Sequence, residues 1–150
     1  MRSFRKDAKI AVFVIVAILL LAQAIRVEKA NPPVSADISA NPAVQHLLHR
    51  SCYNCHSNET VWPWYTNVAP ASWLVASDVN EGRRQLNFSE WGNYNSDTQS
   101  QKLKAIVEEM QGNEMPPWYY SMVHSDARLT PDERDQIRTW AGTAFKTVEK

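Results

Sequence analysis

The chain has 150 residues, the length of one ordinary domain. It carries 16 Lys plus Arg and 16 Asp plus Glu, so its formal net charge is zero, which argues against a nucleic-acid-binding protein that depends on positive charge. Two cysteines are too few for a disulfide-rich scaffold, and a hydrophobic share of 44% excludes an acidic disordered chain.

The N-terminal segment is basic and then apolar. Residues 1–25 hold four basic side chains and one acidic side chain, a net charge of 4 − 1 = +3, and residues 10–22 are an unbroken apolar run. Lys9 and Arg26 bracket 16 uncharged residues, about 24 Å of helix, against roughly 30 Å of bilayer core. We predict that residues 1–25 form an N-terminal membrane anchor, with membrane contact through residues 10–25.

A secretory signal peptide is the alternative interpretation of the same segment. Ala22-Gln23-Ala24 has the small-x-small form of a cleavage site, and an apolar run of 13 residues suits a signal peptide. Both interpretations place residues 26–150 outside the cytoplasm, because the positively charged end of such a segment stays inside.

The exported part begins with the composition of a linker. Residues 26–41 contain Pro32 and Pro33 and few large apolar side chains, which disfavours a helix there. Residues 42–150 are enough for one compact domain with a modest core. They contain no convincing run of alternating apolar residues, so we predict an all-α domain.

Two helix starts are predicted in the first half of this domain. Asn41 can cap a helix that has Pro42 at its first position and runs towards Cys52. Pro70 can begin a second helix, which Gly82 weakens near its end. The inward residues expected on this second helix are Trp73, Leu74, Ser77 and Val79.

Two further helices are predicted in the second half. Ser96 and Gln99 form a capping-box pattern, and Gly112 is expected to end the helix that follows. The apolar stripe of this helix comprises Leu103, Ile106, Val107 and Met110. Thr130 to Glu133 is a complete start signal for the last helix, with Pro131 at its first position.

The motif that carries chemistry is Cys52-Tyr53-Asn54-Cys55-His56, which has the C-x-x-C-H spacing of c-type haem attachment. Two thiols three positions apart can each form a thioether bond with one vinyl group of a porphyrin. His56 is then held at the iron and serves as its proximal ligand through a neutral imidazole. We predict one covalently attached haem c.

Other uses of these cysteines fit the sequence less well. A thioredoxin-type redox dithiol needs a βαβ pattern that is not evident here, and a disulfide across two intervening residues constrains little chain. A structural zinc site needs a second pair of ligands at defined spacing, and the chain has no further cysteine.

Candidates for the sixth iron ligand lie further along the chain. Met115 is followed by Pro116 and Pro117, which stiffen the loop and bar a helix there. His124 is the alternative sixth ligand, and an open or water-filled position is a third possibility. Met110 lies on the predicted apolar stripe and is expected in the core, and Met122 has no comparable setting.

Aromatic and basic residues near the motif have two interpretations each. The groups Trp62-Pro63-Trp64-Tyr65 and Trp118-Tyr119-Tyr120 can wall a haem or can fill an ordinary core. Arg83 and Arg84 can pair with haem propionates, but solvated surface charge is the favoured account.

Two longer stretches carry a family resemblance. They read CYNCHSNETVWPWYTNVAPASWLVASDVNEGRRQLNFSEW (residues 52–91) and EMPPWYYSMVHSDARLTPDE (residues 114–133), with Trp140 beyond them. Together with the similar stretch from Gln23 to Pro33, they resemble the small bacterial haem-binding domain family that is found behind an N-terminal membrane helix. The resemblance covers most of residues 20–145.

The resemblance implies a mostly helical, cytochrome-c-like domain with one covalent haem. It implies attachment at Cys52 and Cys55 with His56 as the proximal ligand. Met115 and His124 both fall at positions that match the family pattern, so the resemblance does not choose between them. It favours the membrane anchor over the signal peptide.

We therefore expect a monohaem c-type cytochrome that transfers one electron at a time. Its place is the periplasmic side of a bacterial inner membrane, or the soluble periplasm if the N-terminal segment is cleaved. No convincing set of acid, base and nucleophile is evident, which favours an electron carrier over an enzyme. The alternatives are a haem-based sensor with a displaceable sixth ligand and a small haem peroxidase with an open sixth position. The expected partners are redox proteins, with no nucleic acid.

Overall fold

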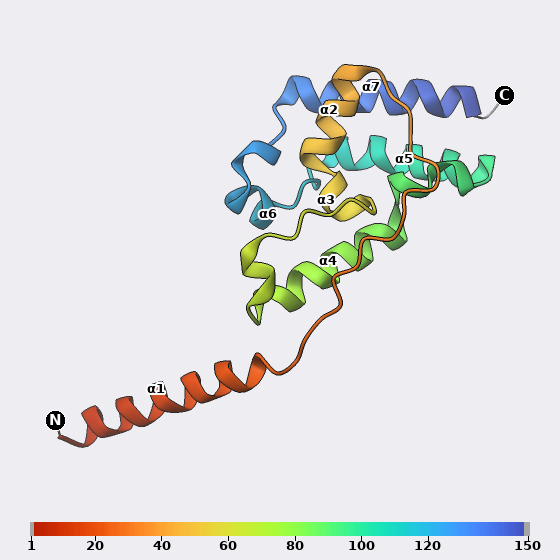
Figure 1. Ribbon diagram of the computed structural model, residues 1–150. Coiled ribbons are helices and arrows are strands. Elements are labelled where there is room, and N and C mark those ends of the chain that lie inside the picture. Colours follow the sequence, from red (N-terminus) through yellow and green to blue (C-terminus); the bar gives the residue numbers. More distant parts are fainter. Residues whose placement is uncertain (1, 149–150) are drawn as a thin grey trace. The chain divides into compact units, whose positions relative to one another are not determined.

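The computed structural model describes residues 2–148, with side chains described from residue 6 on. Every regular element in this range is a helix (Figure 1), so the predicted all-α class is confirmed for the described residues. The elements are α1 (Arg2–Ala22), α2 (Pro42–Ser51), α3 (Tyr53–His56), η1 (Trp64–Asn67), α4 (Ala71–Gln85), η2 (Phe88–Asn93), α5 (Ser96–Gly112), α6 (Trp118–Val123), η3 (Ser125–Ala127) and α7 (Pro131–Val148). The described chain falls into two compact units, residues 2–29 with 62–78 and residues 30–61 with 79–148.

The first unit contains α1, η1 and the beginning of α4. Just after α1, the Gln23 amide donates to the Ala69 carbonyl at 3.2 Å and accepts from the Ala69 N–H at 2.9 Å. The Trp73 indole N–H donates to the carbonyl of Ile25 at 3.0 Å. These bonds tie the chain that leaves α1 to the residues before and within α4.

The apolar side chains of α1 are exposed, with Phe13 at 74% and Leu21 at 74%. Arg2 and Arg5, which belong to the basic start of the predicted anchor, have side chains outside the described set. No helix in the described range meets both the length and the hydropathy needed to span a membrane.

The second unit is built on α5 and α7, which lie side by side and run in opposite directions (Figure 1). α2 packs against α7, and the core lies among these three helices and the residues next to them. The buried core residues are Ile38, Val44, Leu47, Leu48, Tyr53, Phe88, Leu103, Ile106, Met110, Leu129, Ile137 and Ala141. The predicted α5 stripe is therefore confirmed, and Met110 is a core residue.

The caps explain why these helices begin where they do. The Asn41 side chain accepts from the Val44 N–H at 3.1 Å, which confirms the predicted start of α2. The Thr130 hydroxyl accepts from the Glu133 N–H at 3.2 Å, and the Thr130 N–H donates to the Glu133 carboxylate at 2.8 Å, as predicted for a capping box. The predicted cap of α5 is wrong by one residue, because Asn95 rather than Ser96 accepts the first-turn N–H.

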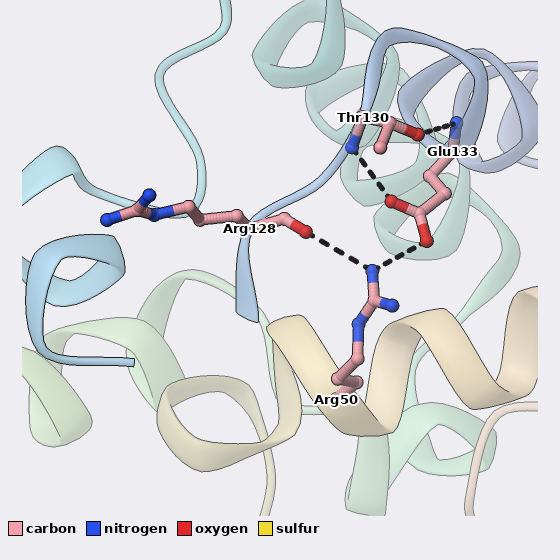
Figure 2. A network of polar contacts seen from close by, with 4 residues as sticks. All are labelled: Arg50, Arg128, Thr130 and Glu133. Atoms are coloured by element: carbon pink, nitrogen blue, oxygen red, sulfur yellow. Dashed lines mark hydrogen bonds and ion pairs between the residues drawn. The ribbon is translucent and has the colours of Figure 1, made fainter. Parts of the chain in front are cut away.

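An ion pair joins α2 to the start of α7 (Figure 2). The Arg50 guanidinium donates to the Glu133 carboxylate at 2.8 Å and to the carbonyl of Arg128 at 3.3 Å. Because Glu133 is also part of the capping box, one carboxylate serves both the cap of α7 and its contact with α2.

The buried face of α4 differs from the predicted face. Leu74 is 53% exposed and Ser77 is also exposed, so the prediction that both point inward is wrong. Ser72, Ala76 and Val79 are buried instead, at the spacing i, i+4 and i+7 that defines one helical face. Small side chains on this face allow close packing that larger ones would prevent.

Residues 30–38, expected as part of a linker, form an extended segment bonded to η2. The backbone N–H groups of Ser35 and Ala36 donate to the Ser89 carbonyl, each at 3.1 Å, and the Ile38 N–H donates to the Phe88 carbonyl at 3.1 Å. Ile38 is 5% exposed and belongs to the core. The second unit thus includes chain that comes before Asn41.

Candidate functional site

The C-x-x-C-H residues form one tight helical turn, made of α3 and of Cys52, which separates α3 from α2. The carbonyl of Cys52 accepts hydrogen bonds from the Cys55 N–H at 3.1 Å and from the His56 N–H at 2.9 Å. Both cysteines are half-buried thiols in the structure. The turn therefore carries two thiols and one imidazole, at positions 52, 55 and 56, on one short helical segment.

The His56 imidazole is oriented by the C-terminal end of α4. Its Nδ1 atom lies 3.0 Å from the carbonyl oxygen of Gly82 and 3.2 Å from that of Leu86. A carbonyl can only accept, so Nδ1 carries the proton and Nε2 keeps its lone pair. Burial lowers the pKa of His56, which favours the neutral imidazole that binds metals. Metal-binding histidines are oriented by the same kind of hydrogen bond from the second ring nitrogen to a carbonyl.

Gly82 permits this contact. A Cβ atom at position 82 would lie 2.6 Å from the Cys55 carbonyl oxygen and 3.2 Å from the Cys55 Cβ. Only glycine lets the backbone of α4 approach the C-x-x-C-H turn this closely. The sequence pattern marked Gly82 as a weak point of the helix, whereas the structure makes it the position where α4 meets the motif.

The first cysteine lies near two cations. Burial raises the pKa of the Cys52 thiol to about 12, with a further rise from Cys55, while the charges of Arg134 and Arg50 lower it. Arg134, on α7, also donates to the carbonyl of Met115 at 2.5 Å. Arg134 therefore connects the Met115 loop with the region of Cys52, and sequence reasoning did not single it out.

His124, the alternative candidate for the sixth ligand, is linked to the motif through Tyr120. The His124 ring stacks on Tyr120, with centroids 4.3 Å apart, and the Tyr120 hydroxyl accepts from the Asn54 amide at 2.8 Å. Asn54 is the second variable residue of C-x-x-C-H. Met115 and His124 are both half-buried, whereas Met122 is 66% exposed.

The Arg83 side chain forms hydrogen bonds with residues on both sides of the motif and is not only solvated. Its guanidinium donates to the carbonyls of Ser57 at 2.7 Å and Ala30 at 2.8 Å, and to side-chain oxygens of Asn31 at 3.0 Å and Thr60 at 2.9 Å. The favoured interpretation of Arg83 as solvated surface charge is therefore wrong. Arg84 fits that interpretation, because its side chain is 67% exposed and pairs with Glu81 on the surface.

Tyr53, the first variable residue of the motif, is 2% exposed and anchors the turn in the core. Its hydroxyl donates to the two carboxylate oxygens of Asp37 at 2.9 and 3.0 Å and accepts from the Gln45 amide at 3.0 Å. Its ring stacks on Phe88, with centroids 5.2 Å apart. Asp37 precedes the predicted domain start, so sequence reasoning gave no sign of this contact.

The predicted aromatic walls include strongly exposed rings. Trp118 is 74% exposed and Tyr119 is 38% exposed, so α6 does not use them as core filling. Trp64, in the first unit, is 79% exposed. Their role as walls of a haem site stays a prediction.

Comparison with known proteins identifies the family of the chain. The model of the haem-binding domain family matches residues 12–143. The chain belongs to the haem-binding domain family. It is also 25% identical over 118 residues to the cytochrome c peroxidase Ccp of Escherichia coli (strain K12). That match covers 77% of this chain but only 25% of the peroxidase, and no solved structure matches the chain.

The donor set of the haem-binding domain fits a haem. His56 offers Nε2 as an iron ligand while its Nδ1–H is committed to backbone carbonyls. The nearby thiols of Cys52 and Cys55 stand on the turn that immediately precedes this imidazole. Among residues 2–148, no cluster of three or more His, Cys, Asp or Glu side chains is placed to hold a bare metal ion.

Proposed function

We propose that this haem-binding domain is a monohaem c-type cytochrome that transfers single electrons. In this proposal Cys52 and Cys55 hold the haem covalently, and His56 is the proximal iron ligand. The observation that carries the proposal is the His56 imidazole, whose Nδ1 lies 3.0 Å from the Gly82 carbonyl and whose Nε2 is thereby left for a metal. The C-x-x-C-H spacing and the family membership support it.

Covalent attachment would be an addition in which no atom is lost. Each Sγ–H adds across one vinyl double bond, so that sulfur bonds to the carbon next to the ring and hydrogen ends on the outer carbon. The step needs no oxidant or reductant. Both thiols are half-buried, and the raised pKa of Cys52 favours the protonated form that such an addition uses.

A bound haem supplies an iron that takes up and releases one electron. Residues of this chain would hold the haem and orient the iron ligand. The turn from Cys52 to His56 fixes the position of the ligand set, and the α4 carbonyls fix the tautomer and direction of the imidazole. Redox titration tests this function: a single reversible one-electron wave is expected, and a protein that takes no electron contradicts it.

We assign Met115 as the sixth ligand and keep His124 as the alternative. Arg134 holds the carbonyl of Met115 and acts on the pKa of Cys52, which supports a location near the haem. Ferric haem with a Met–iron bond shows a weak far-red absorption band. Met115→Ala should abolish this band. A wild-type ferric spectrum that lacks the band, and that changes in His124→Ala but not in Met115→Ala, would favour the alternative.

The cellular place of the protein belongs to the same proposal and rests on the sequence pattern of residues 1–25. We infer that the haem domain lies on the periplasmic side of the inner membrane, retained by the N-terminal segment, with a soluble periplasmic protein as the alternative. Fractionation of the native host, with mass spectrometry of the mature N-terminus, distinguishes the two. An N-terminus at Ile25 would show cleavage, and recovery in the cytoplasm would contradict both.

A haem peroxidase is the second candidate, favoured by the similarity to a cytochrome c peroxidase. This activity needs an open sixth position and a nearby base, a role that His124 could fill. The ferric spectrum separates the candidates. A low-spin, six-coordinate spectrum favours the electron carrier, whereas a high-spin spectrum with peroxide turnover favours the peroxidase.

A further inference from the structure

The end of α4 places partial negative charge beside His56. The carbonyl of Gly82 accepts from both the Leu86 N–H at 2.8 Å and the His56 Nδ1–H at 3.0 Å, and the Leu86 carbonyl lies at 3.2 Å from the same Nδ1. Carbonyls at a helix C-terminus carry the negative end of the helix dipole. Hydrogen bonding to them makes an imidazole a stronger electron donor to a metal.

A cation on a neighbouring helix meets the same end of α4. The Lys102 ammonium, on α5, donates to the carbonyl of Gln85 at 2.6 Å, and Gln85 is the residue directly before Leu86. The ammonium also lies over the ring of Tyr94, 4.6 Å from its centroid. Residue Lys102 is half-buried, while its hydrogen bond to the Gln85 carbonyl lies at the surface.

The other cations near this helix end are engaged differently. Arg83 donates to residues on both sides of the motif turn, and Arg84 pairs with Glu81 at the surface.

We propose that Lys102 is a positioning residue for the redox couple: its ammonium, held on the Gln85 carbonyl, offsets the negative end of α4 and raises the reduction potential of the iron that His56 would bind. The inference rests on the proposed function. Reduction adds one electron from the donor protein to the iron and makes the site more negative by one charge, so a nearby cation stabilises the reduced form.

The test compares the midpoint reduction potential of the haem-loaded Lys102→Gln variant with that of the wild type. Glutamine can still donate to the Gln85 carbonyl, so the substitution removes the charge with little loss of hydrogen bonding. We expect the equilibrium constant for reduction to fall at least roughly threefold, which is about 28 mV at 59 mV per tenfold change. Lys102→Arg, which keeps the charge, should keep the wild-type potential.

Lys104→Gln is the matched control, because Lys104 lies on the same helix with an exposed side chain 3.8 Å from the Glu108 carboxylate. Its potential should stay at the wild-type value. A Lys102→Gln protein with unchanged potential would overturn the inference, as would a Lys102→Arg protein that behaves like Lys102→Gln. If Lys102→Gln does not load haem, the Arg variant decides alone, because a charge role requires it to keep the wild-type potential. If the proposed function itself is wrong, neither the wild type nor any variant will carry covalent haem.

Discussion

The Cys55 carbonyl oxygen lies only 2.6 Å from the position that a Cβ atom would take at Gly82. Real Cβ atoms do not approach a backbone oxygen this closely, so α4 and the C-x-x-C-H turn can be in contact only because residue 82 has no side chain. The same approach brings the Gly82 carbonyl to His56. The packing of α4 and the orientation of the His56 imidazole therefore depend on one glycine.

Replacing this glycine should be costly. Gly82→Ala forces α4 away from the turn, and we expect the free energy of unfolding of the haem-loaded protein to fall by roughly 1–3 kcal/mol, although alanine is the better helix former. Gly142→Ala is the control, since nothing lies within 4 Å of a Cβ there, and it should stabilise α7 by up to about 1 kcal/mol. Urea unfolding measures both, and equal behaviour of the two variants would contradict the close-approach argument.

Arg83 should be needed for the order of the segment before α2. Arg83→Gln loses bonds to Ala30, Asn31 and Ser57, and we expect it to destabilise the protein by roughly 2–3 kcal/mol. The amides of Ser35 and Ile38 should then exchange their hydrogens faster. Arg84→Gln, at an exposed pair, should change stability by less than about 0.5 kcal/mol. Unaltered exchange in Arg83→Gln would argue against this role.

We expect the ionisation of Tyr53 to lower the free energy of unfolding at alkaline pH. Burial and the hydrogen bond to Asp37 raise the pKa of Tyr53 above its usual range. Because the pKa of Tyr53 is higher in the folded state, the stabilisation that its protonated hydroxyl provides is complete below about pH 10, the pKa of an unfolded tyrosine. This stabilisation is lost as the pH rises through the folded-state pKa.

Tyr53→Phe tests that dependence. The variant should be roughly 1–2 kcal/mol less stable at neutral pH, because Asp37 and Gln45 lose their partner. Its stability should then fall less steeply than that of the wild type above about pH 10. Parallel pH profiles for the two proteins, measured by chemical denaturation, would show that Tyr53 is not the titrating group.

The ion pair in Figure 2 should support the start of α7. Hydrogen bonds from the Thr130 backbone, and then from Arg50, lower the pKa of Glu133. Its stabilising contribution is therefore present above about pH 4.3, the pKa of an unfolded glutamate, and is lost as the pH falls through the lower folded-state value. Glu133→Ala should cost roughly 1 kcal/mol at neutral pH by thermal unfolding. Asp135→Ala, which breaks only an exposed pair with Arg138, should cost less, and a reversed order would refute this assignment.

The sequence was most informative where structure is local. The caps at Asn41 and Thr130 and the stripe through Leu103, Ile106 and Met110 were predictable, because each depends on residues three or four positions apart. The cap of α5 is one residue earlier than predicted because Asn95 and Ser96 can both cap a helix. The backbone conformation places Asn95 at the cap.

Long-range contacts were beyond sequence reasoning. Gly82 resembles a helix defect until its neighbour Cys55 is known, and Arg83 resembles surface charge until its four acceptors are known. Leu74 was expected inside because it is large and apolar, yet α4 buries its small side chains instead. For the site, the motif indicated the candidate ligands, and the structure added the carbonyls that orient His56.

The central claim is that one haem is bonded to Cys52 and Cys55. The most direct test is the mass of the mature protein, purified from its native host and measured after denaturation. We expect the mass of the polypeptide plus one haem, and we expect that increment to be lost when both cysteines are replaced by alanine. A denatured wild-type chain with the mass of its amino acids alone would contradict the claim.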